Sequence, residues 1–207
     1  MGISASVSPL PARQNGFVTF GALNQFSKVH EGLLRCWARV LHAVPGSRLI
    51  MICPQGEARE RVRALFAGEG VTADRLELVA YCPWPEYVRL FERIDIALDT
   101  FPCNGMTTIC HALWMGVPVV TQTGASPVSR AGESLLHVVG KSESVARNEE
   151  EFVSIATGWS RDLLHLAEVR ETLRPTMQAS PLMDGPRFAR HIENAFRTMW
   201  QRWCKTL

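Results

Sequence analysis

Hydrophobic positions follow two different spacings in turn along most of the chain. Short apolar or β-rich runs of strand length cover residues 16–23, 48–53, 75–80, 95–100 and 118–122. Apolar residues recur at every third or fourth position, which is helical spacing, over residues 29–44, 57–70, 85–94 and 107–116. Strands and helices that alternate in this way form βαβ units. The pattern therefore predicts an α/β fold with a Rossmann-like parallel sheet and flanking helices.

The pattern becomes mainly helical after about residue 128. Helices are expected over residues 129–140, 149–160, 161–174 and 186–204. The last of these carries one broad apolar stripe, made of Phe188, Ile192, Phe196, Met199, Trp200 and Trp203. A stripe of that width on a terminal helix predicts that the helix packs on a large apolar surface.

The first 15 residues show no such periodicity. They are rich in Ser and Pro, and we interpret residues 1–15 as a linker or disordered tail. Residues 16–207 then form one domain, because no internal repeat or second linker interrupts the pattern.

Composition narrows the classes of function. The chain has 207 residues, 46% of them hydrophobic, and a net charge of +2, which gives no electrostatic reason to expect nucleic acid or an anionic membrane as partner. The start of the chain lacks the pattern of a signal peptide, so the cytoplasm is the expected compartment. The six cysteines show no metal-site spacing, and we expect them to be reduced.

The segment from Asp99 to Thr108 joins an expected strand to an expected helix. In open α/β sheets ligands bind at the carboxyl ends of strands, and a helix N-terminus suits a phosphate. Gly105 allows a close approach of the backbone, and the hydroxyls of Thr107 and Thr108 add donors. Ordinary N-capping by a Thr after a turn explains the same residues, so both interpretations stay open here.

Two further strand ends carry candidate binding residues. Gln25 and Lys28 follow the first strand, where a Lys can neutralise a diphosphate and a Gln can fix a base or sugar. A solvated Lys and a turn Gln are the simpler alternative. After the third strand come Tyr81, Cys82, Trp84 and Tyr87, which can surround a planar base or form a plain hydrophobic loop before a helix that starts at Pro85.

The remaining polar residues favour no nucleophilic or metal chemistry. His111 follows the Thr pair on the expected helix and either faces a ligand or is a partly buried histidine. It has no Ser or Cys partner at triad spacing, and the sequence contains no D-x-D pair. We therefore expect no metal and no cofactor. Lys28 and a helix N-terminus then have to stabilise a leaving diphosphate.

Together these segments resemble the C-terminal catalytic half of the O-linked N-acetylglucosamine transferase family, glycosyltransferase family 41, including its Spindly branch, whose plant members transfer fucose. The resemblance runs from about Gly16 to Cys204. The motifs that carry it lie at residues 23–28, 97–100, 104–108, 113–121 and 180–186.

The resemblance implies a GT-B enzyme, with two Rossmann-like halves across a cleft, of which this chain is the half that binds the nucleotide sugar. It implies that Lys28 contacts the diphosphate and is needed for transfer, and that Gln25 lines the donor site. Thr107 and Thr108 then hold the phosphates, and the loop from Tyr81 to Tyr87 packs around uracil.

The sequence departs from the animal enzyme around the same site. Met106 stands where that enzyme has a His, and His111 stands where an Asp contacts the ribose. Trp84 and Leu90 replace basic residues near the base. These differences leave the identity of the sugar donor open.

The resulting hypothesis is a glycosyltransferase domain that binds UDP-N-acetylglucosamine for transfer to Ser or Thr of a protein. Its expected partners are a UDP-sugar, a protein acceptor, and the N-terminal lobe and tetratricopeptide repeats of the family, which this sequence lacks. The alternatives are transfer of fucose or glucose, a module that binds a nucleotide or packs on a lobe without catalysis, and a phosphate-binding protein of another class.

Overall fold

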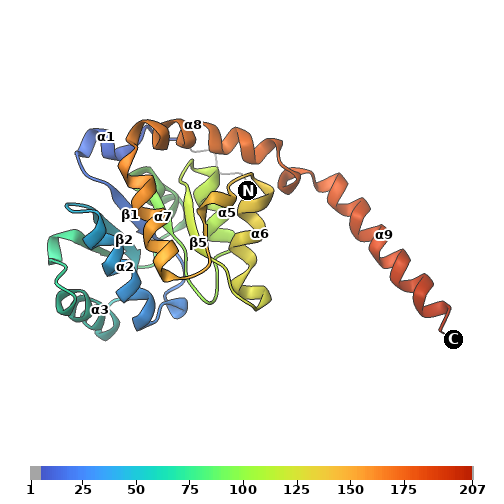
Figure 1. Cartoon of the computed structure of the whole chain (residues 1–207), viewed down its shortest axis with the longest axis horizontal. Helices are drawn as coiled ribbons and strands as arrows, with labels where there is room; N and C mark the ends of the chain where they lie inside the picture. The colour runs from blue at the N-terminus through green and yellow to red at the C-terminus, as the bar shows by residue number, and fades with distance from the viewer. Residues whose placement is uncertain (1–5, 207) are drawn as a thin grey trace.

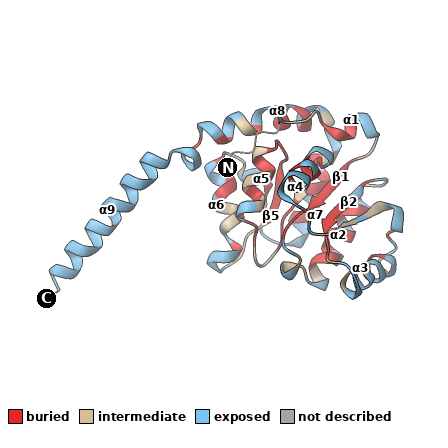
Figure 2. Cartoon of the chain, turned by 180° about the vertical axis from the view of Figure 1, so that it is seen from behind, coloured by how far each residue is buried: buried red, intermediate tan, exposed pale blue. Residues whose placement is uncertain are grey.

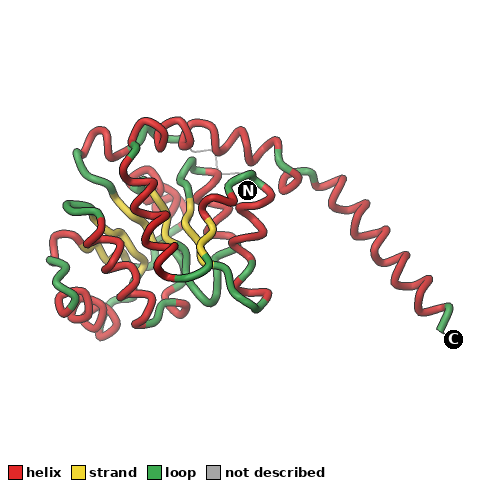
Figure 3. The backbone as a smooth tube through the Cα atoms, viewed as in Figure 1, coloured by secondary structure: helices red, strands yellow, loops and turns green. Residues whose placement is uncertain are grey.

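The described part of the chain contains six strands, which are all parallel and form one sheet. The computed structural model describes residues 6–206 (Figures 1 and 3). The strands are β1 (Thr19–Ala22), β2 (Arg48–Ile52), β3 (Leu76–Val79), β4 (Ile96–Leu98), β5 (Val119–Gln122) and β6 (Val145–Ala146). Their order in the sheet is β3-β2-β1-β4-β5-β6. This is the doubly wound order of Rossmann folds, so the predicted fold class is confirmed.

Helices connect and cover the strands. They are α1 (Pro11–Asn15), α2 (Glu31–Ala43), α3 (Glu57–Gly68), α4 (Trp84–Leu90), α5 (Thr107–Trp114), α6 (Ala131–Val138), α7 (Glu149–Arg161), α8 (Leu163–Ala179) and α9 (Gly185–Cys204). The short 3-10 helices are η1 (Phe26–Lys28), η2 (Ala73–Arg75), η3 (Phe91–Arg93), η4 (Pro127–Ser129), η5 (Ser142–Ser144) and η6 (Pro181–Met183). Helices α2 and α7 pack against each other on one face of the sheet, and α5 packs against α8 (Figure 1).

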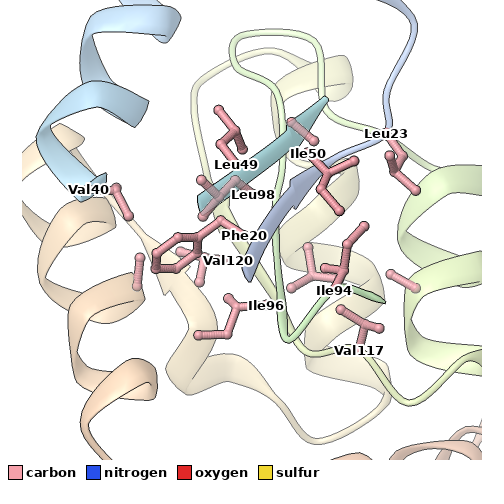
Figure 4. Packing of buried hydrophobic residues seen from close by; sticks show 14 of the residues in the cluster. Phe20, Leu23, Val40, Leu49, Ile50, Ile94, Ile96, Leu98, Val117 and Val120 are labelled. Atoms are coloured by element: carbon pink, nitrogen blue, oxygen red, sulfur yellow. The ribbon is translucent and has the colours of Figure 1, made fainter. Parts of the chain in front are cut away.

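The core lies on both faces of the sheet. Phe20, Leu98 and Val120 point toward the side where Val40 of α2 lies, and Ile50 and Ile94 lie on the opposite side (Figure 4). Gly21 on β1 is required by this packing, because a Cβ atom there would lie 2.3 Å from the side chain of Ile94. The central strands are therefore buried on both faces, which explains their continuous apolar runs.

The N-terminal segment differs from the expected linker or tail. Residues 1–5 of that expectation lie outside the described residues. Leu10 and Ala12 are buried, and Pro11 begins α1. The backbone N–H of Ala12 donates to Asp95 at 2.8 Å. Residues 10–15 are thus part of the packed domain, because three buried apolar residues, Leu10, Pro11 and Ala12, and a buried carboxylate fix them.

A buried arginine of α8 extends this attachment. Arg170 is 1% exposed and donates to the carbonyl oxygen and the hydroxyl of Ser8, each at 2.8 Å. It also donates to the carbonyl oxygens of Phe91 and Ile94. Burial lowers the pKa of Arg170 to about 10. Helix α8 therefore contacts both the N-terminal segment and the turn that leads into β4.

Helix α9 projects away from the rest of the molecule (Figures 1 and 2). Every residue of α9 is exposed, including its expected apolar stripe. The helix itself is confirmed over nearly the expected residues. That it packs on a large surface stays a prediction, because nothing within residues 6–206 covers the stripe.

Candidate functional site

A pocket of about 840 Å³ lies beside the carboxyl ends of the strands. The sheet order makes β1 and β4 neighbours, and the chain leaves them toward opposite sides, which creates a crevice at this switch point. Every candidate residue from the sequence except Gly105 lines the pocket, namely Gln25, Lys28, Tyr81, Cys82, Trp84, Tyr87, Met106, Thr107, Thr108 and His111. The fold thus brings together three loops that are far apart in the sequence.

Lys28 reaches the pocket from the 3-10 helix η1 after β1. Its Nζ donates to the backbone carbonyl oxygen of Asn104 at 2.9 Å. An ammonium group has three donors, so this contact leaves two for a ligand. The contact also places the positive charge beside the loop that leads into α5.

The N-terminus of α5 forms the next wall. Within the described residues, the N-cap Met106 makes no side-chain capping bond, and the first turn of α5 contains no acidic residue. The positive end of the helix dipole is therefore uncompensated beside Lys28. Thr107 is exposed and Thr108 is half-buried, so both hydroxyls lie at a pocket wall that favours an anion.

Aromatic side chains form a further wall, which includes His111 of α5. The ring of Trp84 lies 4.8 Å from that of His111 and 5.7 Å from that of Tyr87, measured between centroids. Nδ1 of His111 lies 3.4 Å from the Tyr87 hydroxyl. Tyr81 accepts the backbone N–H of Phe26 at 3.1 Å, which links the loop after β3 to η1.

Burial shifts the titration of this wall. It raises the pKa of Tyr87 to about 12, against the opposing effect of a hydrogen bond with Thr108. It also lowers the pKa of His111 and raises that of the Cys82 thiol. At neutral pH the aromatic wall therefore carries no charge, and the positive charge of the pocket is concentrated at Lys28 and the α5 N-terminus.

Gly105 has a different place from the one expected. It is buried, it is not among the pocket-lining residues, and its N–H donates to Oδ1 of Asp99 at 2.8 Å. A Cβ atom at this position would lie 2.7 Å from Oδ1 of Asn24. The glycine is therefore needed for close packing of the loop on Asn24, and its amide is already occupied.

Sequence reasoning missed part of the lining. Leu23, Ile52, Cys103, Asn104, Pro127, Val128 and Ala131 also line the pocket. Pro127, Val128 and Ala131 follow β5, whose carboxyl end lies at the same edge of the sheet as the others. The Gly, Ser and Pro residues over 124–127 marked a loop after a strand, and that signal could have indicated a fourth wall.

Two negative findings concern the described residues. No group of three or more His, Cys, Asp or Glu side chains within residues 6–206 is arranged to hold a metal ion. In the same part of the chain, no helix combines the length and the apolar character that crossing a bilayer requires.

A doubly wound sheet with an anion-favouring pocket at its switch point is typical of nucleotide-binding α/β domains. The family model for glycosyl transferase family 41 matches residues 9–192. The chain belongs to glycosyl transferase family 41.

Relatives of known name agree with this assignment. The chain is 43% identical over 202 residues to a probable UDP-N-acetylglucosamine–peptide N-acetylglucosaminyltransferase SPINDLY from Petunia hybrida. The match covers 96% of this chain and 22% of that protein. The corresponding protein of Arabidopsis thaliana is 39% identical over 203 residues and covers the same shares. The chain thus spans about a fifth of the length of these relatives.

A solved structure confirms the expected half of a GT-B enzyme. A mutant of the Thermobaculum terrenum O-GlcNAc transferase superposes with a TM-score of 0.89 at 38% identity. The match covers 99% of this chain and 40% of that one. This chain therefore has the fold of the Rossmann-like half, with its C-terminal helices, of that O-GlcNAc transferase.

Proposed function

We propose that this chain is the nucleotide-sugar-binding half of a glycosyltransferase that transfers N-acetylglucosamine from UDP-N-acetylglucosamine to Ser or Thr of a protein. The observation that supports the proposal best is the position of Lys28 beside the uncapped N-terminus of α5 in one pocket. The names of the relatives support the donor and the protein acceptor.

The phosphates are proposed to bind between Lys28 and the α5 N-terminus. A diphosphate there accepts hydrogen bonds from the Lys28 amine, the Thr107 hydroxyl and the free amides of the first turn. As the bond between sugar and phosphate breaks, negative charge grows on the leaving UDP, and the Lys28 ammonium stabilises it. Lys28 thus fills the catalytic role, and no metal or other cofactor is needed in this proposal.

The base is proposed to lie against the aromatic wall. Trp84 and Tyr81 are 43% and 61% exposed, so their rings offer faces on which a planar base can stack. Gln25, which is exposed at the pocket edge, supplies an amide for a hydrogen bond. Met106 is 63% exposed beside the phosphates and contacts the sugar in this arrangement.

The acceptor-binding surface and the other wall of the cleft are proposed to come from an N-terminal lobe like that of the longer relatives. The apolar stripe of α9 is the surface that such a lobe would cover. The same exposed stripe favours a second candidate function, a module that binds nucleotide or a lobe and catalyses nothing by itself.

The test is calorimetry on the whole chain with UDP-N-acetylglucosamine, UDP-glucose and GDP-fucose, each with and without EDTA. The proposal expects UDP-N-acetylglucosamine to bind most tightly and EDTA to have no effect. Tighter binding of GDP-fucose would show that the proposed donor is wrong and that fucose is the sugar transferred. Binding of none of the three would overturn the proposal.

A transfer assay separates the two candidates. The chain is incubated with donor and acceptor peptide, alone and with the N-terminal lobe of a relative. Turnover only with the lobe supports the proposed enzyme, and binding without turnover in either case supports the second candidate. A cytoplasmic location also stays a proposal, which cell fractionation tests.

A further inference from the structure

Asp99 directly follows strand β4 and is buried, with 3% of its surface exposed. One carboxylate oxygen, Oδ1, accepts from the Gly105 backbone N–H at 2.8 Å and from Nδ2 of Asn24 at 2.9 Å. The other oxygen, Oδ2, accepts from the Thr121 hydroxyl at 2.7 Å. The two oxygens thus accept from different neighbours. Oδ1 binds the loop before α5 and the segment after β1, and Oδ2 binds β5.

The loop from residue 100 to residue 106 fits tightly against this carboxylate. Nδ2 of Asn24 also donates to the Thr100 hydroxyl at 3.0 Å, and that hydroxyl donates to the Cys103 carbonyl at 2.7 Å. Because a Cβ atom at Gly105 would lie 2.7 Å from Asn24 and 3.1 Å from Asp99, the loop has no space to move closer. Its entry into α5 is fixed from the buried side.

The segment after β1 holds the same loop from the outside. Lys28 donates to Asn104, and Nε2 of His30 lies 2.9 Å from the Phe101 carbonyl oxygen. Nδ1 of His30 accepts the Leu33 N–H at 3.3 Å, so Nε2 carries the proton and donates. The loop before α5 is therefore clamped between a buried carboxylate and two side chains of the β1–α2 connection.

A carboxylate is an expensive group in this position. Among the described residues no cation is a cause of the Asp99 pKa shift, and burial raises the pKa to about 6 despite the hydrogen bonds that oppose it. A neutral or apolar residue would fill the site at lower cost. The carboxylate has one feature that a carboxamide lacks, which is acceptor capacity on both oxygens for donors on two sides.

We propose that Asp99 is a positioning residue of the donor site, whose Oδ1 fixes the Gly105 amide and thereby sets Thr107 and the α5 N-terminus at the distance from Lys28 that a diphosphate requires. Asp99 is not among the residues that line the donor pocket, so it acts through the loop. This inference rests on the proposed function, and it adds a residue that binds no ligand itself.

The test compares the two sides of the same carboxylate. Asp99→Asn removes acceptor capacity from one oxygen, and Thr121→Val removes only the donor on the β5 side. Calorimetry with UDP-N-acetylglucosamine is expected to show at least about tenfold weaker binding for Asp99→Asn and a change below about twofold for Thr121→Val. In amide NMR spectra of the free proteins, the resonances of Met106 to Thr108 are expected to move in Asp99→Asn and to stay in place in Thr121→Val.

A second variant keeps the test decisive if Asp99→Asn does not fold. Gly105→Ala adds a methyl group toward Asn24 and Asp99, on the side away from the pocket, and is expected to weaken binding by at least about tenfold. Gly158→Ala on α7, whose added Cβ meets nothing within 4 Å, is the matched control and should bind as the wild type does.

Three outcomes are distinguishable. If the wild type binds no UDP-sugar, the proposed function fails. If the wild type binds and the folded Asp99→Asn, or in its place Gly105→Ala, binds within twofold of it, the positioning role is wrong. Equal losses in Asp99→Asn and Thr121→Val also overturn it, because they indicate a general effect on packing.

Discussion

The side-chain amine of Lys28 and the backbone carbonyl of Asn104 lie 2.9 Å apart, although 76 positions separate them in the sequence. The sheet order causes this proximity, since β1 and β4 are neighbours and their following loops meet at one edge. The contact sets a positive charge beside the start of α5, and the account of the site depends on that arrangement.

The two threonines at the start of α5 should contribute unequally. Thr107 is exposed to the pocket, whereas Thr108 shares a hydrogen bond with Tyr87. We expect Thr107→Val to weaken binding of UDP-N-acetylglucosamine by about tenfold, since a hydrogen bond to a charged group is worth about 1.5–3 kcal/mol, and Thr108→Val to have a smaller effect. Calorimetry measures both. Thr198→Val on exposed α9 is the control, and a larger loss for Thr108 would contradict the assignment.

Stability should depend on pH through Asp99. Its folded-state pKa is raised from 3.8 to about 6, so the stability that this carboxyl contributes is fully present below pH 3.8 and is lost as the pH rises through about 6. Compared with Asp99→Asn, which does not titrate, the wild type should lose about 3 kcal/mol of unfolding free energy between about pH 4 and pH 7.

Urea unfolding of both proteins over that pH range measures this difference. Lys28 and His30, which contact the same loop, are present in both proteins, so the comparison isolates the change at Asp99. If the difference in unfolding free energy between the wild type and Asp99→Asn stays constant with pH, Asp99 does not titrate in this range.

The buried Arg170 should matter for stability and little for binding. Arg170→Ala removes the buried guanidinium that donates to the carbonyl oxygens of Ser8, Phe91 and Ile94, and we expect a loss of about 3 kcal/mol in unfolding free energy. Arg161→Ala, at an exposed position of α7, should change it by less than about 0.5 kcal/mol. Chemical denaturation measures both. UDP affinity of the folded Arg170→Ala should equal that of the wild type, and a selective loss of affinity would contradict the prediction.

Removal of residues 185–207 should leave the domain intact. Because α9 is fully exposed, we expect truncation to change the unfolding free energy by less than about 0.5 kcal/mol and to leave UDP affinity unchanged. The truncated chain should also bind less of a hydrophobic dye, because the apolar stripe is gone. A loss of more than about 2 kcal/mol would show that α9 packs on the domain.

The sequence allowed the layout to be predicted, because periodicity reports which face of an element is buried. Strand β6 was missed because it has only two residues, Val145 and Ala146, which is too short a run to show a period. Helix α1 was missed for a similar reason, since only Leu10, Pro11 and Ala12 of that segment are buried and they are consecutive.

The sequence predicted those site residues that directly follow a strand. It did not predict the contacts that one loop makes with another. Lys28 and Thr107 could be placed at strand and helix ends from the pattern. That Gly105 faces Asn24 and Asp99 rather than the pocket depends on three loops meeting, and no spacing in the sequence encodes such a contact. Val128, in η4 after β5, was missed because the segment after that strand carries no recognisable chemistry.

The most direct test of the central claim is the affinity of the chain for UDP before and after Lys28→Ala, measured by calorimetry at one salt concentration. Lys205→Ala, at the exposed C-terminal end, controls for the change in net charge. The account predicts at least about tenfold weaker binding for Lys28→Ala and no change for Lys205→Ala. Equal affinity of Lys28→Ala and the wild type would contradict the claim that a diphosphate binds between Lys28 and the start of α5.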